Sequence, residues 1–393
     1  MKYWESNKVI LACDELREKI CGKKIALMMN TTALDNEGRL LIDRIIDEKW
    51  ANVAFLLGME HGVRGNLMAA DSNLSTCDIR TGIHIVNLYE YPEFKPPVER
   101  LKEVDCVVFC AQDVGVRHWS FTPWMMSLID SACKAGCEVI VLDRPNPIRG
   151  DIVEGAPAQS PYAGTELLSG FEYPLRHGMT IGELALMYND VKQIGANVSV
   201  LKMRGWKRDM WYEDTGLPWV PASPNMPTVD TALYFAATGL MQGADFSLGI
   251  GTTTPFQYIG GVGFDGSRLA DALNSKGLDG VYFLQKYYLA KTYIKDANGV
   301  KKRENALCDG VLMLIQDRNK WRPVKTQLKI METLQELYGD QINFENHKLS
   351  RPRMCTDEIC DALSKGQSLS FIIKKWESGV KEFLVARAPY LLY

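Results

Sequence analysis

Five short runs of apolar residues divide the first 150 residues of the chain. Within each run the apolar positions are consecutive or nearly so, whereas a strand with one solvent-facing side would alternate apolar and polar residues. Continuous runs of this length are typical of strands in a parallel sheet that is covered on both faces. We therefore predict five buried parallel strands, at residues 25–29, 53–57, 83–86, 106–110 and 139–142.

Two of the intervals between these runs carry apolar residues at helical spacing. The two stripes consist of Leu40, Leu41, Ile45 and Ile46, and of Trp124, Leu128, Ile129, Ala132 and Cys133. Gly136 follows the second stripe and suits the end of a helix. Alternating strands and helices predict an α/β fold: a doubly wound, mostly parallel, Rossmann-like sheet with right-handed crossovers.

The pattern changes further along the chain. A Gly- and Pro-rich region spans residues 144–178, Thr180 and Glu183 form a capping box that predicts a helix start, and short strands and helices mix from about residue 260. Two later helices are predicted from apolar stripes at 328–337, before Gly339, and at 372–383. We predict a Rossmann-like domain over residues 1–255 and a smaller mixed α+β domain over residues 256–393.

Composition excludes some classes of protein. The formal net charge of −3 argues against general affinity for nucleic acid or an anionic membrane, and no segment has the roughly 20 apolar residues of a membrane helix. The polar N-terminus lacks the pattern of a signal peptide, so we expect a cytoplasmic protein. The ten cysteines lie mostly in apolar segments without zinc-knuckle spacing, which predicts reduced, buried thiols.

Polar residues follow each predicted strand, at the edge where open parallel sheets bind ligands. They are Asn30-Thr31-Thr32, Glu60-His61, Asn87 with Tyr89, Gln112-Asp113, and Asp143-Arg144 with Asn146. Loops are polar in any protein, so a single cluster indicates little. We interpret the segments 60–65 and 112–117 together as functional, because carboxylate, imidazole and guanidinium groups packed this closely are unfavourable for stability and useful in catalysis.

Familiar catalytic motifs are missing from the sequence. It has no Walker loop, no Gly-x-Gly-x-x-Gly after the first strand, no His-Glu-x-x-His and no Gly-x-Ser-x-Gly elbow, so we expect no nucleotide cofactor and no metal. Abundant carboxylates near Arg, Asn, Gln and aromatic residues suit a sugar site, where two carboxyl groups can cleave a glycosidic bond. Composition alone does not establish this function.

Several sequence blocks in order resemble the exo-acting β-N-acetylmuramidases of bacterial peptidoglycan turnover. The blocks are Gly58-Met59-Glu60-His61-Gly62-Val63-Arg64-Gly65, Gln112-Asp113-Val114-Gly115-Val116-Arg117, Leu142-Asp143-Arg144-Pro145-Asn146-Pro147, Val153-Glu154-Gly155, Arg176-His177-Gly178-Met179-Thr180 and the segment 221–228 around Asn225. The resemblance extends from about residue 9 to Tyr393. It implies a glycosidase, with the first domain catalytic, that removes terminal N-acetylmuramic acid from the non-reducing ends of peptidoglycan fragments.

The resemblance implies carboxylate chemistry centred on Glu60, the first candidate for the catalytic acid; the alternative is a structural pair between Glu60 and Arg64. Candidates for a second carboxylate are Asp113, Asp143 and Glu154, with Glu154 first because its loop could reach over the sugar. Asp113 and Asp143 could instead be held by Arg117 and Arg144. The remaining candidates bind substrate: Arg64, Arg117 and Arg144 for the lactyl carboxylate, and His61, Gln112, Asn146, His177 and Asn225 for other groups of the sugar.

The chain also departs from the family pattern. Leu248 and Ile250 stand where the family usually has Glu and Arg, and Gln257 replaces a Glu. The segment His118-Trp119-Ser120-Phe121 stands where the family usually has aromatic residues that include Tyr. Two alternatives therefore stay open: a sugar-binding protein that has lost turnover, and a metal-dependent hydrolase using His61, His177 and Asp143. The expected partner is a small carbohydrate, a muropeptide or disaccharide; many relatives are exported, and a cytoplasmic member would suit recycling of imported disaccharides. The sequence does not determine the oligomeric state.

Overall fold

The protein forms two lobes, seen in a computed structural model that describes residues 8–67, 76–159, 170–242, 245–291, 305–342, 344 and 354–393. The elements of the first lobe are α1 (Cys13–Ile20), β1 (Lys24–Met29), α2 (Leu41–Asp47), β2 (Asn52–Gly58), β3 (Ile85–Asn87), α3 (Val98–Leu101), β4 (Cys106–Cys110), α4 (Phe121–Ala135), β5 (Glu138–Leu142), α5 (Ile181–Val191) and β6 (Val198–Leu201). The later elements are α6 (Asp230–Thr238), β7 (Tyr258–Gly261), α7 (Gly266–Asn274), β8 (Val281–Leu289), β9 (Leu307–Ile315), α8 (Pro323–Tyr338), α10 (Glu358–Ser364) and α11 (Ser370–Arg387).

The larger sheet has six parallel strands in the order β3-β2-β1-β4-β5-β6. The chain winds outward from β1 to β3, returns to β4 beside β1, and winds outward on the other side. The strand order therefore reverses between β1 and β4, and in such sheets ligands bind beyond the carboxyl ends of the strands near this point.

Both faces of this sheet are covered, as continuous apolar strands require. Ile25, Leu27 and Met29 of β1 pack in one hydrophobic cluster with residues of α1 and α2. Ala26 and Met28 of the same strand belong to the other cluster, which includes residues of α4 and α5. Alternate side chains of one strand thus enter two different core layers. The predicted doubly wound α/β sheet is confirmed.

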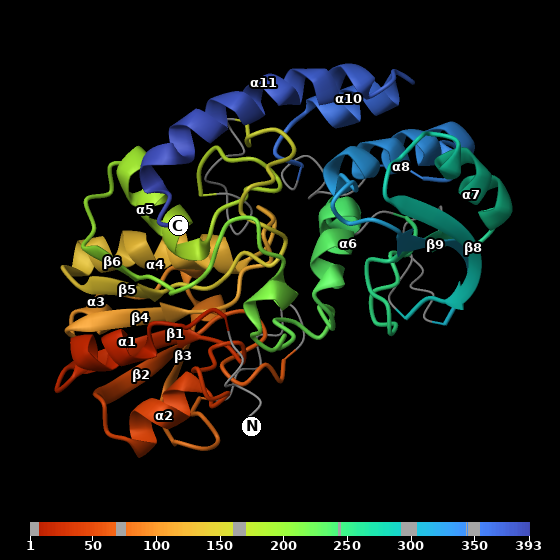
Figure 1. Ribbon diagram of the computed structural model, residues 1–393. Coiled ribbons are helices and arrows are strands. Elements are labelled where there is room, and N and C mark those ends of the chain that lie inside the picture. Colours follow the sequence, from red (N-terminus) through yellow and green to blue (C-terminus); the bar gives the residue numbers. More distant parts are fainter. Residues whose placement is uncertain are drawn as a thin grey trace.

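The second lobe is built on a three-stranded antiparallel sheet in the order β7-β9-β8, packed against α7 and linked through α7 to α8 (Figure 1). Helix α6 packs against α8. From the second lobe, α11 runs back across the molecule to the first, where the C-terminus lies beside α5 (Figure 1). The smaller α+β lobe is confirmed, and the predicted boundary near residue 255 stays a prediction.

Several elements lie outside the predicted set, and the reason is clearest for α6 and β6. Helix α6 is buried at eight of its nine residues, so it has no polar face and no amphipathic stripe in its sequence. Strand β6 has four half-buried residues at the sheet edge, too few for a clear pattern. Among the helices that the structure describes, none is long and apolar enough to cross a membrane.

Candidate active site

The carboxyl ends of β1 and β4 are tied together at the point where the strand order reverses. The backbone N–H of Gln112 donates to Thr32 Oγ1 at 2.9 Å, and the Thr32 hydroxyl donates to the side-chain oxygen of Asn30. The Asn30 amide in turn donates to the carbonyl of Ala222 at 3.2 Å. The Pro-rich loop that contains Ala222 is therefore fastened over the strand ends, where the sequence analysis placed the site.

Glu60 lies in a tight turn directly after β2. His61 and Gly62 both adopt left-handed backbone conformations, with φ of 68° and 73°, and the N–H of Gly62 donates to the carbonyl of Met59 at 2.9 Å. Left-handed backbone is unusual for a residue such as His, so the surrounding structure must hold this turn. The Nδ1 atom of His61 lies 3.1 Å from the carbonyl oxygen of Leu67, which fixes the orientation of the buried imidazole.

Glu60 differs from the other three candidate carboxylates in its exposure. Asp113, Asp143 and Glu154 are 3%, 0% and 9% exposed. Glu60 is only half-buried, and the hydroxyl of Ser120 donates a hydrogen bond to its Oε2 atom. A catalytic acid must meet the substrate, and Glu60 is the candidate whose side chain reaches the surface.

The structural pair between Glu60 and Arg64, considered above, is replaced by a different arrangement. Arg64 binds Asp43 and Asp78, each through two nitrogen–oxygen contacts of 2.7–2.9 Å. The hydrogen bonds from Arg64 hold the pKa of the Asp78 carboxyl well below its usual range. Arg64 therefore braces the loop that carries Glu60, and its guanidinium is occupied by protein carboxylates.

Asp113 and His177 form a second buried polar group. The Asp113 carboxylate accepts hydrogen bonds from the N–H of Gly115 at 2.7 Å and from the hydroxyl of Thr122 at 3.2 Å. His177 Nε2 lies 3.2 Å from Asp113 Oδ2, and His177 Nδ1 accepts from the N–H of Met179. Because Nδ1 is an acceptor, a neutral imidazole carries its proton on Nε2, the nitrogen nearer the carboxylate.

The two other arginines are also engaged, mainly by backbone carbonyls. Arg117 donates to the carbonyl oxygens of Ala156, Tyr173 and Met354 at 2.7–3.2 Å. Arg144 donates to the carbonyl oxygen of Leu34 at 2.6 Å. Both side chains are buried, so they hold loops in place.

The amide side chains of Gln112 and Asn146 also donate hydrogen bonds to backbone carbonyl oxygens. Gln112 donates to the carbonyl oxygens of Asp113 and Pro145, and Asn146 donates to that of Met179. Gln112 also lines a small cavity beyond the ends of β1 and β4, together with Thr32, Asp35, Arg144 and Tyr212. Gln112 and Arg144 are thus brought together, while Asn146 stabilises the turn after β5.

Asp143 lies at the end of β5 in a closed network. Its carboxylate accepts hydrogen bonds from the hydroxyls of Thr180 and Tyr393 and from the N–H groups of Gly182 and Arg144. Burial and the nearby carboxylate of Glu183 raise the pKa of Asp143 to about 7. The contacts with Arg144 involve its backbone, whereas the sequence analysis considered its side chain.

Glu154 joins the two lobes. Arg176 donates to Glu154 Oε1 at 2.6 Å, and the N–H of Val324, at the start of α8, donates to Oε2 at 3.3 Å. The backbones of Glu154 and Arg176 also form an antiparallel β-bridge. Burial lowers the pKa of Arg176, whose charge is balanced by Glu154. Glu154 is therefore bound within the protein in this structure.

The residues that depart from the family pattern have structural partners. Leu248 is buried in the main hydrophobic cluster, where a Glu would require a partner for its charge. Gln257 donates to the Tyr234 hydroxyl and to the Met313 carbonyl oxygen. Asn225 Oδ1 accepts from the N–H of Gly251 at 3.1 Å, which joins the Pro-rich loop to the Gly-rich stretch.

The part of the chain that the structure describes contains no group of side chains suited to binding a metal ion. No three His, Cys, Asp or Glu residues there lie close enough to hold a metal ion. His61, His177 and Asp143, all within the described ranges, therefore do not form the metal-binding group considered above.

The sequence analysis assigned no role in this arrangement to three of its residues: Asp43, Asp78 and Ser120, the last noted only within a departure from the family pattern. Each contacts its partner through tertiary folding across 14 to 60 residues, and no local spacing signals such contacts. A serine in front of an apolar helical stripe suggests only a helix cap.

Comparison with known proteins decides the family. The N-terminal and C-terminal family models described as exo-β-N-acetylmuramidase NamZ match residues 25–230 and 233–393. The chain belongs to the exo-β-N-acetylmuramidase NamZ family. The resemblance given on sequence blocks is thus confirmed, as is the expected enzyme class, a glycosidase.

Individual relatives agree with this assignment. The chain is 35% identical over 379 residues to the peptidoglycan β-N-acetylmuramidase NamZ of Bacillus subtilis (strain 168), covering 96% of this chain and 89% of the relative. Two crystal structures of DUF1343 family proteins from Bacteroides fragilis NCTC 9343 share the fold. Their TM-scores are 0.87 and 0.74 at 30% and 26% identity, with 98% of this chain and 99% of each relative covered.

Proposed function

We propose that this protein hydrolyses the glycosidic bond of terminal N-acetylmuramic acid at the non-reducing ends of peptidoglycan fragments, with Glu60 as the catalytic acid. Membership of the NamZ family supports the reaction. The observation that carries the role of Glu60 is its accessibility: it is half-buried at a strand end, whereas Asp113, Asp143 and Glu154 are buried.

In the proposed step, Glu60 donates its proton to the glycosidic oxygen as the bond from that oxygen to the anomeric carbon breaks. The oxygen of water forms the new bond to the anomeric carbon, directly or after a covalent intermediate. On the direct route a base on the opposite face of the sugar takes the proton from water, and Glu60 is reprotonated from solvent. After a covalent intermediate, Glu60 itself takes the proton from water. The products are free N-acetylmuramic acid and a fragment shortened by one sugar.

The surrounding candidates receive supporting roles in this proposal. Arg64 holds the loop that carries Glu60, and Arg117 holds the loop that carries Ser120, rather than binding the lactyl carboxylate, because their guanidinium groups are already bound by the protein. We retain His61, Gln112 and Asn225 as the candidates for contacts with the sugar, since each lies on a loop at or over the strand ends.

For substrate and location we propose small muropeptides or disaccharides in a reducing compartment such as the cytoplasm. Eight of the ten cysteines, all except Cys355 and Cys360, are free thiols, and five of these eight are buried. Proteins with several unpaired cysteines are typical of reducing environments. The Cys13 thiol, whose pKa burial raises to about 12, is chemically inert at neutral pH.

The test uses a chromogenic β-N-acetylmuramide and a muramic-acid-containing disaccharide. The wild-type protein should release the chromophore and free N-acetylmuramic acid. Glu60→Gln should lower kcat/KM on the disaccharide by about 10²–10⁴-fold, the usual contribution of a general acid. Glu99→Gln is the matched control, because Glu99 is an exposed carboxylate paired only with Lys102 among the contacts described, and it should match wild type.

Two outcomes would contradict the proposal. Absence of release by the wild-type protein, together with calorimetric binding of muropeptide that Glu60→Gln leaves unchanged, would indicate a sugar-binding protein. Release that continues unchanged in Glu60→Gln would assign the acid to another residue.

A further inference from the structure

Ser120 occupies the position of a helix cap but does not cap its helix. It directly precedes α4, where a serine side chain usually accepts a hydrogen bond from an N–H of the first turn. Here the backbone of Ser120 is already helical, with φ −63° and ψ −23°, and its side chain makes no cap bond. The hydroxyl donates instead to Oε2 of Glu60, 60 residues away in sequence.

The loop that presents Ser120 is anchored on both sides by one carboxylate. Asp113 accepts from the N–H of Gly115, before Ser120, and from the hydroxyl of Thr122, after it. Arg117, between them, donates to three backbone carbonyls. These bonds restrict the backbone from residue 113 to residue 122, so the position of the Ser120 hydroxyl is fixed relative to the sheet.

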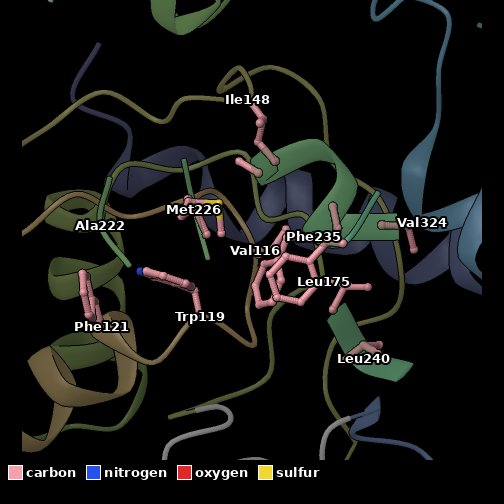
Figure 2. Close-up of a cluster of buried hydrophobic side chains, with 14 of the residues drawn as sticks. Val116, Trp119, Phe121, Ile148, Leu175, Ala222, Met226, Phe235, Leu240 and Val324 are labelled. Atoms are coloured by element: carbon pink, nitrogen blue, oxygen red, sulfur yellow. The ribbon is translucent and has the colours of Figure 1, made fainter. Parts of the chain in front are cut away.

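Packing restricts the same loop further. A Cβ atom on Gly115, at φ +83°, would lie 2.5 Å from a side-chain carbon of Ile148, so only glycine fits there. The Trp119 ring lies 5.0 Å from that of Phe121 and 5.8 Å from that of Phe235, measured between centroids, within the buried cluster of Figure 2. Ser120 therefore follows a buried, immobilised aromatic residue.

We propose that Ser120 is a positioning residue for the acid: its hydroxyl holds Oε2 of Glu60, so that Oε1 is the atom that delivers the proton to the glycosidic oxygen. This inference rests on the proposed function. A half-buried glutamate has three side-chain torsions, and a fixed donor on one oxygen selects the rotamer that faces the substrate. Such orientation acts on the chemical step rather than on binding of the substrate.

The first test separates turnover from binding. Ser120→Ala should lower kcat on the disaccharide on the order of tenfold, with KM within about twofold of wild type. Ser120→Thr keeps the hydroxyl and should restore most of kcat. Ser127→Ala, on the same helix, removes a hydroxyl that donates to the carbonyls of Trp124 and Phe94, and should leave both constants unchanged. A larger change in KM than in kcat for Ser120→Ala would overturn the inference. So would a Ser120→Thr variant that is inactive although its melting temperature equals that of the wild-type protein.

The second test is a double-mutant cycle on a nitrophenyl muramide, whose leaving group needs little protonation, so that Glu60→Gln retains measurable activity. If Ser120 acts through Glu60, Ser120→Ala should lower kcat in the wild-type background and cause no further loss when added to Glu60→Gln. An equal fold-loss in both backgrounds would show that Ser120 acts independently and overturn the inference. Absence of hydrolysis by the wild-type protein would contradict the proposed function itself. Melting temperatures identify any misfolded variant, and Ser120→Cys, a weak donor of similar size, then replaces Ser120→Ala with the same expectations.

Discussion

At the scale of single residues, most of the polar residues around Glu60 are held by the protein. Arg64 is bound by Asp43 and Asp78, and Arg117 by three carbonyls. Polar groups buried in this way must be paired, and their pairing fixes the loops at the strand ends. Glu60 differs from them in its exposure: Ser120 holds one of its carboxylate oxygens, and its side chain is only half-buried.

The Arg64 network gives a prediction for stability. The Asp78 side chain is fully buried, so Asp78→Asn removes a charge that Arg64 requires and should lower the free energy of unfolding by about 2–3 kcal/mol. Asp47→Asn is the control, because Asp47 and Arg80 form an exposed pair worth less than about 1 kcal/mol. Urea denaturation measures both. Equal effects of the two variants would contradict a structural role for the buried network.

At the scale of elements, the continuous apolar strands and the helices with a clear apolar stripe or cap were predicted, whereas the uniformly buried helix α6 was not. The capping box of Thr180 and Glu183 is present at α5, and Gly136 ends α4 in a left-handed conformation, as the sequence indicated. Helix α6 has no polar face, so periodicity could not identify it. The position of Glu60 follows from the end of a strand, but its partner Ser120 comes from another loop, and only the folded chain brings them together.

The cap of α5 should contribute measurably to stability. The Thr180 hydroxyl accepts from the N–H of Glu183 and donates to Asp143, so Thr180→Ala loses two bonds and should cost about 1–2 kcal/mol. Thr180→Ser keeps the hydroxyl and should lose less than half as much. Thermal unfolding followed by circular dichroism would detect the difference. Indistinguishable Ala and Ser variants would mean that the hydroxyl is not what stabilises this helix end.

At the scale of the whole molecule, the C-terminal segment ties the second lobe back to the sheet. At the end of α11, Arg387 donates to the carbonyl oxygens of Gly150 and Gly178, and beyond the helix the Tyr393 hydroxyl donates to Asp143 at the end of β5. Neither contact could be predicted from sequence, because apolar periodicity describes how one element packs and gives no information about which distant loop it reaches.

Asp143 makes this junction sensitive to pH. Its pKa is raised from an ordinary value of 3.8 to about 7 by burial and by Glu183, so the folded state binds a proton that the unfolded state releases. The stability from this group is complete below about pH 4 and is lost as the pH rises through 7. In Asp143→Asn, the free energy of unfolding should therefore fall less between pH 4 and pH 7 than in wild type.

The control for this comparison is Asp190→Asn, a surface carboxylate that accepts from the Tyr390 hydroxyl of the same C-terminal segment. It should keep the wild-type dependence on pH. If Asp143→Asn follows the wild-type curve over this range, the buried carboxyl is ionised in the folded protein and the assignment is wrong.

The most direct test of the central claim, that Glu60 is the catalytic acid, compares Glu60→Gln on two substrates that differ only in the leaving group. A sugar leaving group needs a proton, whereas 2,4-dinitrophenolate leaves without one. The account predicts a loss of roughly 10³-fold in kcat/KM on the muramyl disaccharide, and a loss of less than about tenfold on the dinitrophenyl muramide. Equal losses of kcat/KM on both substrates, in a Glu60→Gln variant with the melting temperature of the wild-type protein, would contradict this role of Glu60.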